Sequence, residues 1–314
     1  MKTNDNFQET SYKIHREVYD DFAVGGDKEA LAKTWLQKDS VGAWRFERMY
    51  RLLDPILESE PDAKWLTVGD GRYGGDAKYI QDKGIDVLAT DITDKLLKEA
   101  KDKGYLKKYR QENAESLSFN DSEFDFVLCK ESYHHFPRPM IALYEMLRVA
   151  AKGVVLIEPT DLYINNGIRK VLFRKLMDLI NGLLGKKIER HAFEEAGNYI
   201  YNISRREIEK VALGLSYRLV AFHGVNDYYE KGVEFEKISD KGRLYRKVKF
   251  RISLLNMLTR TKFNDYSLTV AIIFKKEPSA ILIKNLNKAG YDIVSLPINP
   301  YIYRGAGVSY KEGH

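Results

Sequence analysis

Three glycines and an aspartate give the first indication of chemistry in this chain. Gly69, Gly71 and Gly74 lie in the stretch WLTVGDGRYGGDA and satisfy the spacing G-x-G-x-x-G. Glycine suits such a turn because the backbone must leave a strand sharply and because a Cβ would hold a ligand away from the main chain. Asp91 follows the next apolar stretch, at the spacing from which a carboxylate reaches the hydroxyls of a ribose. Together these residues predict a site for a nucleotide or a nucleoside.

Two adjacent histidines are a second candidate for chemistry. His134 and His135 follow the apolar stretch Phe124–Cys129. An imidazole near its usual pKa accepts a proton at neutral pH, so either histidine could act as a general base for a hydroxyl nucleophile. For one of the pair, the alternative is a structural histidine that is hydrogen-bonded to nearby backbone. Tyr133 and Glu131 could shape the pocket instead.

The spacing of apolar residues indicates the elements that position these groups. Four short, apolar or β-branched stretches are typical of strands buried in a parallel sheet, namely Trp65–Val68, Gly84–Thr90, Phe124–Cys129 and Val154–Ile157. A more polar strand is suggested at Lys107–Gln111. Helical spacing recurs between the strands, most clearly from Pro139 to Val149, with Gly153 ending that helix. Alternating strands and helices predict a doubly wound α/β fold.

The composition describes a globular protein of 314 residues, with 44% hydrophobic and 31% charged residues. This length can bury a full core, as one elaborated domain or as two smaller ones. Cys129 is the single cysteine, so a disulfide within the chain is excluded and a reducing compartment fits. The polar stretch MKTNDNFQET lacks the apolar core of a signal peptide, and no run of about 18 apolar residues occurs. We therefore expect a cytoplasmic protein without a membrane span.

The charge and the ligand types limit the expected partners. A net charge of +6 permits anionic partners, but the basic residues form no concentrated domain, so nucleic acid is not expected. No dense set of Asp, Asn and His ligands is visible, so no metal site is predicted.

The succession from Trp65 to Pro159 resembles the core of class I S-adenosylmethionine-dependent methyltransferases, in the branch that modifies small molecules. The parts in register are the glycine turn, Asp91, the loop Asn113-Ala114-Glu115, and the segments FDFVLC and ALYEMLRVAAKGVVLIEP. The chain departs from the family pattern at Thr67, where an acidic residue is frequent, and at Asn113, where aspartate is common. The AAKG turn also lacks the usual paired glycines.

This resemblance implies a Rossmann-like, doubly wound α/β fold whose seven-stranded sheet has the order 3-2-1-4-5-7-6, with the last strand antiparallel. It also implies S-adenosyl-L-methionine as cofactor. The glycine turn would lie against the amino-acid end of the cofactor, Asp91 would bind the ribose, and Asn113 and Ala114 would lie at the adenine edge. The cofactor-binding candidates are Gly69, Asp70, Gly71, Asp91, Ile92, Asn113, Ala114, Glu115 and Lys130.

The family also suggests where an acceptor would bind. His134 and His135 would emerge beside the transferred methyl group as catalytic candidates, and Tyr133, His191 and His223 are candidates for substrate contact. Two other classes share the glycine turn: an NAD-dependent oxidoreductase and a non-catalytic binding protein. The chain has only one such fingerprint and no recognisable catalytic Lys/Tyr pair, which counts against the oxidoreductase.

The N-terminal segment and the core have separate predicted roles. The core comprises residues 61–160 and 216–276, where two further apolar stretches read as strands six and seven. Residues 1–60 are interpreted as a helical flank or as a lid. In the second case a few aromatic side chains would reach a pocket, and these are Tyr12, Tyr19 and Trp35.

Three further segments extend this core. Residues 161–215 carry a broad apolar helical face with interspersed Arg and Lys, which predicts a helical cap; a dimer face or a peripheral membrane contact are the alternatives. A second insertion at residues 228–264 carries a basic stretch that suits either a solvated surface or an anion-binding rim. Residues 277–314 are interpreted as a small C-terminal appendage or an oligomer contact.

The acceptor is left open by the fold. The large insertions and the 21 tyrosines favour O-methylation of a saccharide or another hydroxylated metabolite, because tyrosines can stack on sugar rings. A quinone or a lipid-linked acceptor is the alternative, through the apolar helical face.

Overall fold

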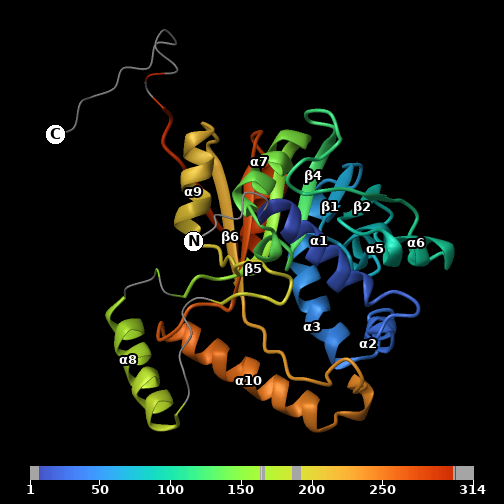
Figure 1. Cartoon of the computed structure of the whole chain (residues 1–314). Helices are drawn as coiled ribbons and strands as arrows, with labels where there is room; N and C mark the ends of the chain where they lie inside the picture. The colour runs from blue at the N-terminus through green and yellow to red at the C-terminus, as the bar shows by residue number, and fades with distance from the viewer. Residues whose placement is uncertain (1–6, 163, 165–166, 186–191, 300, 302–314) are drawn as a thin grey trace.

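A computed structural model describes residues 7–162, 164, 167–185, 192–299 and 301 (Figure 1). Within these residues an eight-stranded sheet has the order β3-β2-β1-β4-β5-β7-β6-β8. Its strands are β1 Trp65–Val68, β2 Val87–Asp91, β3 Tyr109–Gln111, β4 Phe124–Lys130, β5 Ala150–Pro159, β6 Leu219–Val225, β7 Leu268–Phe274 and β8 Asp292–Ser295. Strands β1 to β5 pair in parallel, whereas β7 is antiparallel to both β5 and β6. The predicted α/β class and strand order are confirmed, and β8 is an additional strand.

Helices cover both faces of the sheet. They are α1 Phe7–Asp20, α2 Glu29–Thr34, α3 Val41–Tyr50, α4 Asp54–Ser59, α5 Gly75–Asp82, α6 Lys95–Asp102, α7 Pro139–Val149, α8 Ile168–Leu183, α9 Arg205–Gly214, α10 Arg243–Arg260 and α11 Ala280–Lys288. One face packs against apolar residues of α4, α5, α6 and α11, and the other against those of α7 and α9. Strand β1 serves both faces, because Trp65 and Leu66 point in opposite directions and are both fully buried.

Two segments differ from the sequence interpretation. Gly153 does not end a helix: α7 stops at Val149, and Gly153 lies within β5, where a Cβ would approach the carbonyl oxygen of Ile273 to 2.8 Å. The close approach of β7 explains the glycine. Residues 280–295, part of the proposed appendage, instead supply α11 and β8, and β8 pairs with β6 at the edge of the sheet.

The two insertions contribute helices of different kinds. In the first, α9 packs against the sheet, whereas α8 has no buried residue. In the second, the basic stretch forms α10, which packs Val248 and Ile252 against Val41 and Val233. Figure 1 shows α8 and α10 together below the sheet. Within the described ranges, every helix is too short or too polar to cross a membrane.

Candidate active site

The turn after β1 requires glycine because neighbouring strand ends approach it closely. Gly69 has φ +75°, and a Cβ there would lie 2.5 Å from the Cβ of Ser132, just beyond β4. A Cβ on Gly71 would lie 2.9 Å from Oδ2 of Asp91, at the end of β2. Both glycines therefore let three strand ends converge on one point, which is where ligands bind in sheets of this type.

Asp70 fixes the start of the helix that follows the turn. Its carboxylate accepts the backbone N–H groups of Asp76 and Ala77 at 3.1 and 2.8 Å and the hydroxyl of Thr67 at 2.9 Å. Burial, with the nearby Asp76 carboxylate, raises the pKa of Asp70 well above its ordinary value. Thr67, which departs from the family pattern, is therefore a partner of this cap. Asp70 lies at the cavity wall, but its oxygens already accept hydrogen bonds from the first turn of α5.

The ends of β2 and β3 present the groups predicted for the nucleoside. Asp91 accepts the Thr93 backbone N–H at 3.1 Å. Burial raises its pKa from 3.8 to about 6, although backbone N–H groups oppose that rise. Asn113 accepts the N–H of Glu115 at 3.0 Å, which shapes the following loop. A carboxylate with few partners at this position can accept further donors, as a ribose diol would require.

These strand ends open into a cavity of about 790 Å³. All nine predicted cofactor residues lie on its wall, as does His135. The N-terminal helices close the other side with aromatic side chains, among them Tyr12, Tyr19 and Trp35. Tyr133, His134 and His223 do not line this cavity within the described residues. His191 lies outside the described residues.

Glu115 joins the N-terminal helix to the core. It accepts the hydroxyl of Tyr12 at 2.6 Å and both the backbone N–H and Nε of Arg138, at 2.7 and 2.6 Å. At the other end of α1, the Thr93 hydroxyl donates to Asp20 at 2.6 Å. Helix α1 is therefore attached to the loops after β2 and β3, across the cavity. Arg138 was not singled out from the sequence, since nothing local indicates a partner 23 residues earlier.

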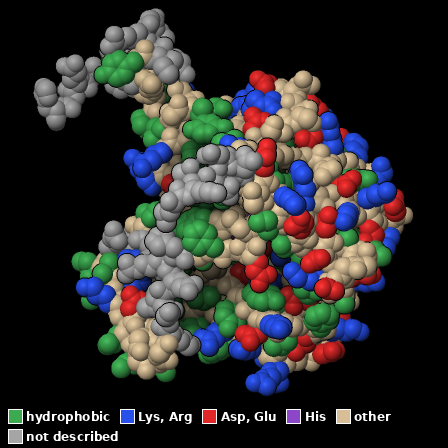
Figure 2. Space-filling view, in the orientation of Figure 1, with side chains coloured by type: hydrophobic (Ala, Val, Ile, Leu, Met, Phe, Trp, Pro, Cys, Tyr) green, Lys and Arg blue, Asp and Glu red, His purple; other side chains and the backbone are tan. Residues whose placement is uncertain are grey.

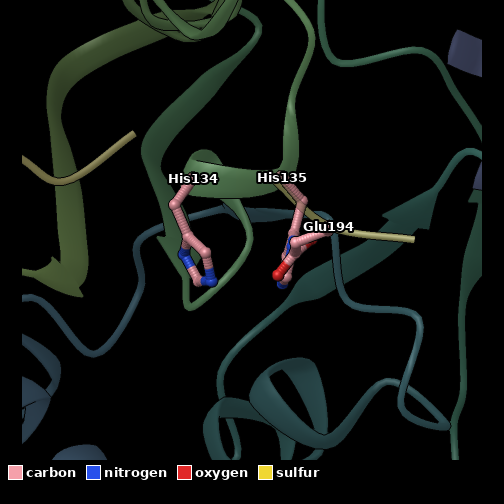
Figure 3. A group of neighbouring side chains, drawn as sticks. All are labelled: His134, His135 and Glu194. Carbon is pink, nitrogen blue, oxygen red and sulfur yellow. The ribbon is translucent and has the colours of Figure 1, made fainter. Parts of the chain in front are cut away.

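The two histidines lie on a single 3₁₀ turn, Tyr133–His135, but have different partners (Figure 3). His134 Nδ1 is 2.6 Å from the buried Glu158, which also accepts the N–H groups of Ser132 and Tyr133 at 2.9 and 3.0 Å. Burial disfavours the charged imidazole, but the Glu158 carboxylate outweighs it and raises the pKa of His134. His134 thus helps to hold the turn in place.

His135 faces the cavity and pairs with Glu194 through Nδ1. Burial lowers its pKa, and the neighbouring His134 acts in the same direction, while Glu194 opposes both. A lowered pKa keeps the imidazole neutral at pH 7, which is the form that accepts a proton. Donor atoms of His134, His135 and Glu194 lie within 4.8 Å of one another, close enough to hold a cation. Because both Nδ1 atoms already have carboxylate partners, we interpret the group as two histidine–carboxylate pairs.

A half-buried acidic group, Glu131, lies beside the glycine turn. Glu131 has φ +48°, a rare conformation for a residue with a side chain, and its Oε2 is buried without a hydrogen-bond partner in the described chain. Lys130 Nζ is 3.6 Å from this oxygen and 3.3 Å from Asp76. A buried carboxylate oxygen that accepts no hydrogen bond from the described chain, on a cavity wall, fits the ammonium group of an amino-acid ligand. The sequence suggested only that Glu131 shapes the pocket.

Residues 66–157 match the family described as methyltransferase domain. The chain therefore contains a class I S-adenosylmethionine-dependent methyltransferase domain. Its matched segment runs from β1 to β5 and so contains the glycine turn, Asp91, Asn113 and the histidine pair. The methyltransferase is an enzyme with S-adenosyl-L-methionine as cofactor, as the resemblance in the sequence implied, and Asp91 and Glu131 supply acceptors that fit the ribose and amino-acid ends of that cofactor.

The methyltransferase is similar to several known proteins. A relative in Shewanella oneidensis, the ubiquinone/menaquinone biosynthesis C-methyltransferase UbiE, is 29% identical over 192 residues, which are 58% of this chain and 74% of the relative. Among solved structures, the YcgJ protein of Bacillus subtilis is 17% identical with a TM-score of 0.47, over 74% of this chain and 100% of the other. A magnesium protoporphyrin IX methyltransferase from Synechocystis is 14% identical with a TM-score of 0.45, over 86% and 96%.

Proposed function

We propose that this methyltransferase methylates a hydroxylated small molecule and that His135 is the general base. The observation that carries the proposal is His135 itself, a neutral imidazole on the cavity wall whose Nδ1 is held by Glu194. Nε2 is then the nitrogen that can take the acceptor's proton, and the Glu194 carboxylate stabilises the imidazolium that forms. When bound, the cofactor supplies a methyl group on a positively charged sulfur, which is already electrophilic.

The remaining contribution of the chain is to orient the acceptor and exclude water. Helix α1 lies across the cavity and is attached through Tyr12 and Asp20. Its Tyr19 ring lies 6.4 Å from the His135 ring in an edge-on arrangement, so the base sits under an aromatic cover. Such enclosure holds the reacting groups together and favours transfer to the acceptor over loss to water.

Among hydroxylated acceptors, we favour an aromatic, quinol-type ring over the saccharide predicted from the sequence. Phe22 and Trp35 on the cavity wall pack at 5.0 Å between ring centroids, a surface suited to a flat ring. The relative in Shewanella, whose name describes a quinone C-methyltransferase, supports the same class. Removing the hydroxyl proton from a quinol activates both its oxygen and the adjacent ring carbons, so one base serves O- or C-methylation.

The test has a binding part and a turnover part. Calorimetric titration should detect S-adenosylhomocysteine but not NAD. Incubation with methyl-labelled cofactor and either a simple quinol or a saccharide should label the quinol, and NMR of the product identifies the methylated atom. His135→Gln should lower turnover by about 10²–10⁴-fold while affinity for S-adenosylhomocysteine stays within about twofold.

His223→Gln is the matched control, since His223 lies away from the cavity beside Tyr291. Its turnover should equal that of the unmodified enzyme. Full turnover by the His135 variant would contradict the role of His135 as general base. Labelling of the saccharide alone would contradict a quinol-type acceptor.

A further inference from the structure

Helix α8 carries an apolar stripe that no other described part of the chain covers. The stripe consists of Ile168, Leu172, Leu176, Leu179 and Leu183, whose side chains are 54–80% exposed. At 3.6 residues per turn these five positions fall within about 80° of the helix circumference. An apolar surface of this kind marks an interaction site in a well-folded protein.

The opposite side of α8 attaches the helix to the rest of the enzyme. Lys170 pairs with Asp265, and the Phe173 ring lies 6.3 Å from the ring of Phe263. Both attachments lie roughly 100–160° around the helix from the centre of the stripe. The apolar stripe therefore points away from the protein. Figure 1 shows α8 at the lower left of the molecule. Figure 2 shows hydrophobic side chains beside Lys and Arg at this corner.

The charges around the stripe are positive. Arg169 and Lys175 lie at its two margins, and α8 contains one acidic residue, Asp178. The adjoining α10 has six basic residues and no acidic one, with Phe250 and Met257 exposed among them. A second copy of the chain would bring the same positive charges face to face, which disfavours a dimer through this surface.

We infer that α8 binds the surface of an anionic phospholipid bilayer. The leucine stripe would enter the boundary between headgroups and acyl chains, while Arg169, Lys175 and the basic face of α10 meet the headgroups. With 16 residues, α8 is about 24 Å long and lies in the membrane plane without crossing it. This inference stands on α8 and α10 and does not depend on the identity of the acceptor.

The experiment is flotation of the full-length protein with vesicles of phosphatidylcholine, with or without 30–40% phosphatidylglycerol (about one lipid in three, enough to set a negative surface potential). We expect binding to the anionic vesicles that weakens as salt is added. Leu176→Ser with Leu179→Ser should lower the partition coefficient at least about tenfold, and Lys175→Glu by about fivefold or more. Ile281→Ser, a change at a 65% exposed position on α11, is the matched control and should bind as the unmodified protein does.

Far-UV circular dichroism and S-adenosylhomocysteine titration check that each variant is folded. The inference is overturned if the protein does not bind anionic vesicles. It is equally overturned if sedimentation shows a dimer that the two leucine substitutions dissociate, because the stripe would then be covered by a second copy.

Discussion

Asp91→Asn separates the contribution of this carboxylate to cofactor binding from its effect on stability. Burial raises the pKa of Asp91 from 3.8 to about 6, so the folded protein disfavours the ionised form. That rise corresponds to about 3 kcal/mol at neutral pH, and solvent at this half-buried position lowers our expectation to about 1–3 kcal/mol. Asparagine keeps an acceptor for the Thr93 N–H but carries no charge. The variant without cofactor should therefore be more stable by this amount at pH 7.5.

The sign of the pH dependence follows from the raised pKa. Below about pH 4 the carboxyl is protonated in both the folded and the unfolded chain, so Asp91 adds no penalty there. The penalty develops between about pH 4 and pH 6 and is constant above, so the stability gain of the variant should shrink towards zero as the pH falls to 4. Urea unfolding at pH 7.5 and pH 4.5 measures this gain. Asp102→Asn, an exposed change on α6, is the control and should stay within about 0.5 kcal/mol.

Affinity should change in the opposite direction. Losing hydrogen bonds to a charged acceptor costs about 1.5–3 kcal/mol, so S-adenosylhomocysteine should bind the Asp91 variant about 10–150-fold more weakly. Calorimetry at pH 7.5 provides the comparison. A variant that binds as tightly as the unmodified enzyme would refute the role of Asp91 in the cofactor site, and a less stable variant would refute the argument from burial.

Two further substitutions test the turn and the base. Gly69→Ala places a side chain at φ +75° where it collides with the turn after β4, and should destabilise the fold by about 2–4 kcal/mol in urea unfolding. The control is Gly84→Ala, at φ +84° with open space around it, which should lose only about 1 kcal/mol. Equal losses of stability in the two variants would contradict the steric argument. Glu194→Gln removes a carboxylate that raises the pKa of His135, so the acid limb of the rate profile should move to lower pH while the maximal rate falls about tenfold or more. The control Glu195→Gln should leave the pH–rate profile unchanged. If the acid limb does not shift in the Glu194 variant, Glu194 does not set the pKa of His135.

The strands that carry the site could be predicted because their signal is local. The stretches at β1, β4 and β5 are apolar and are bounded by glycine, charge or proline, so their type does not depend on distant partners. Strand β8 had no such signal: Asp292–Ser295 is short and no residue in it is buried, and its pairing with β6 decides its conformation. The predicted end of α7 was wrong for the same reason, because Gly153 is required by the close approach of β7 and does not mark the end of a helix.

The histidine pair shows where sequence reasoning stops. The two rings lie side by side, with centroids 4.0 Å apart, but only His135 lines the cavity, whereas His134 is held by a buried carboxylate. Which of them does so is decided by Glu158, 24 residues after His134, and by Glu194, 59 residues after His135. Neither carboxylate is marked as a partner by the sequence around it.

The acidic residues around the cofactor motif are of two kinds: some already accept hydrogen bonds from the chain, and others remain available to a ligand. Asp70 and Glu115 match the family pattern, but each already accepts three hydrogen bonds from the chain, and these bonds fix α5 and attach α1. Asp91 and Glu131 are half-buried acidic groups with fewer hydrogen-bond partners in the described chain, so their oxygens can accept donors from a ligand. Changes at the first pair should therefore lower stability, whereas changes at the second pair should lower affinity for the cofactor.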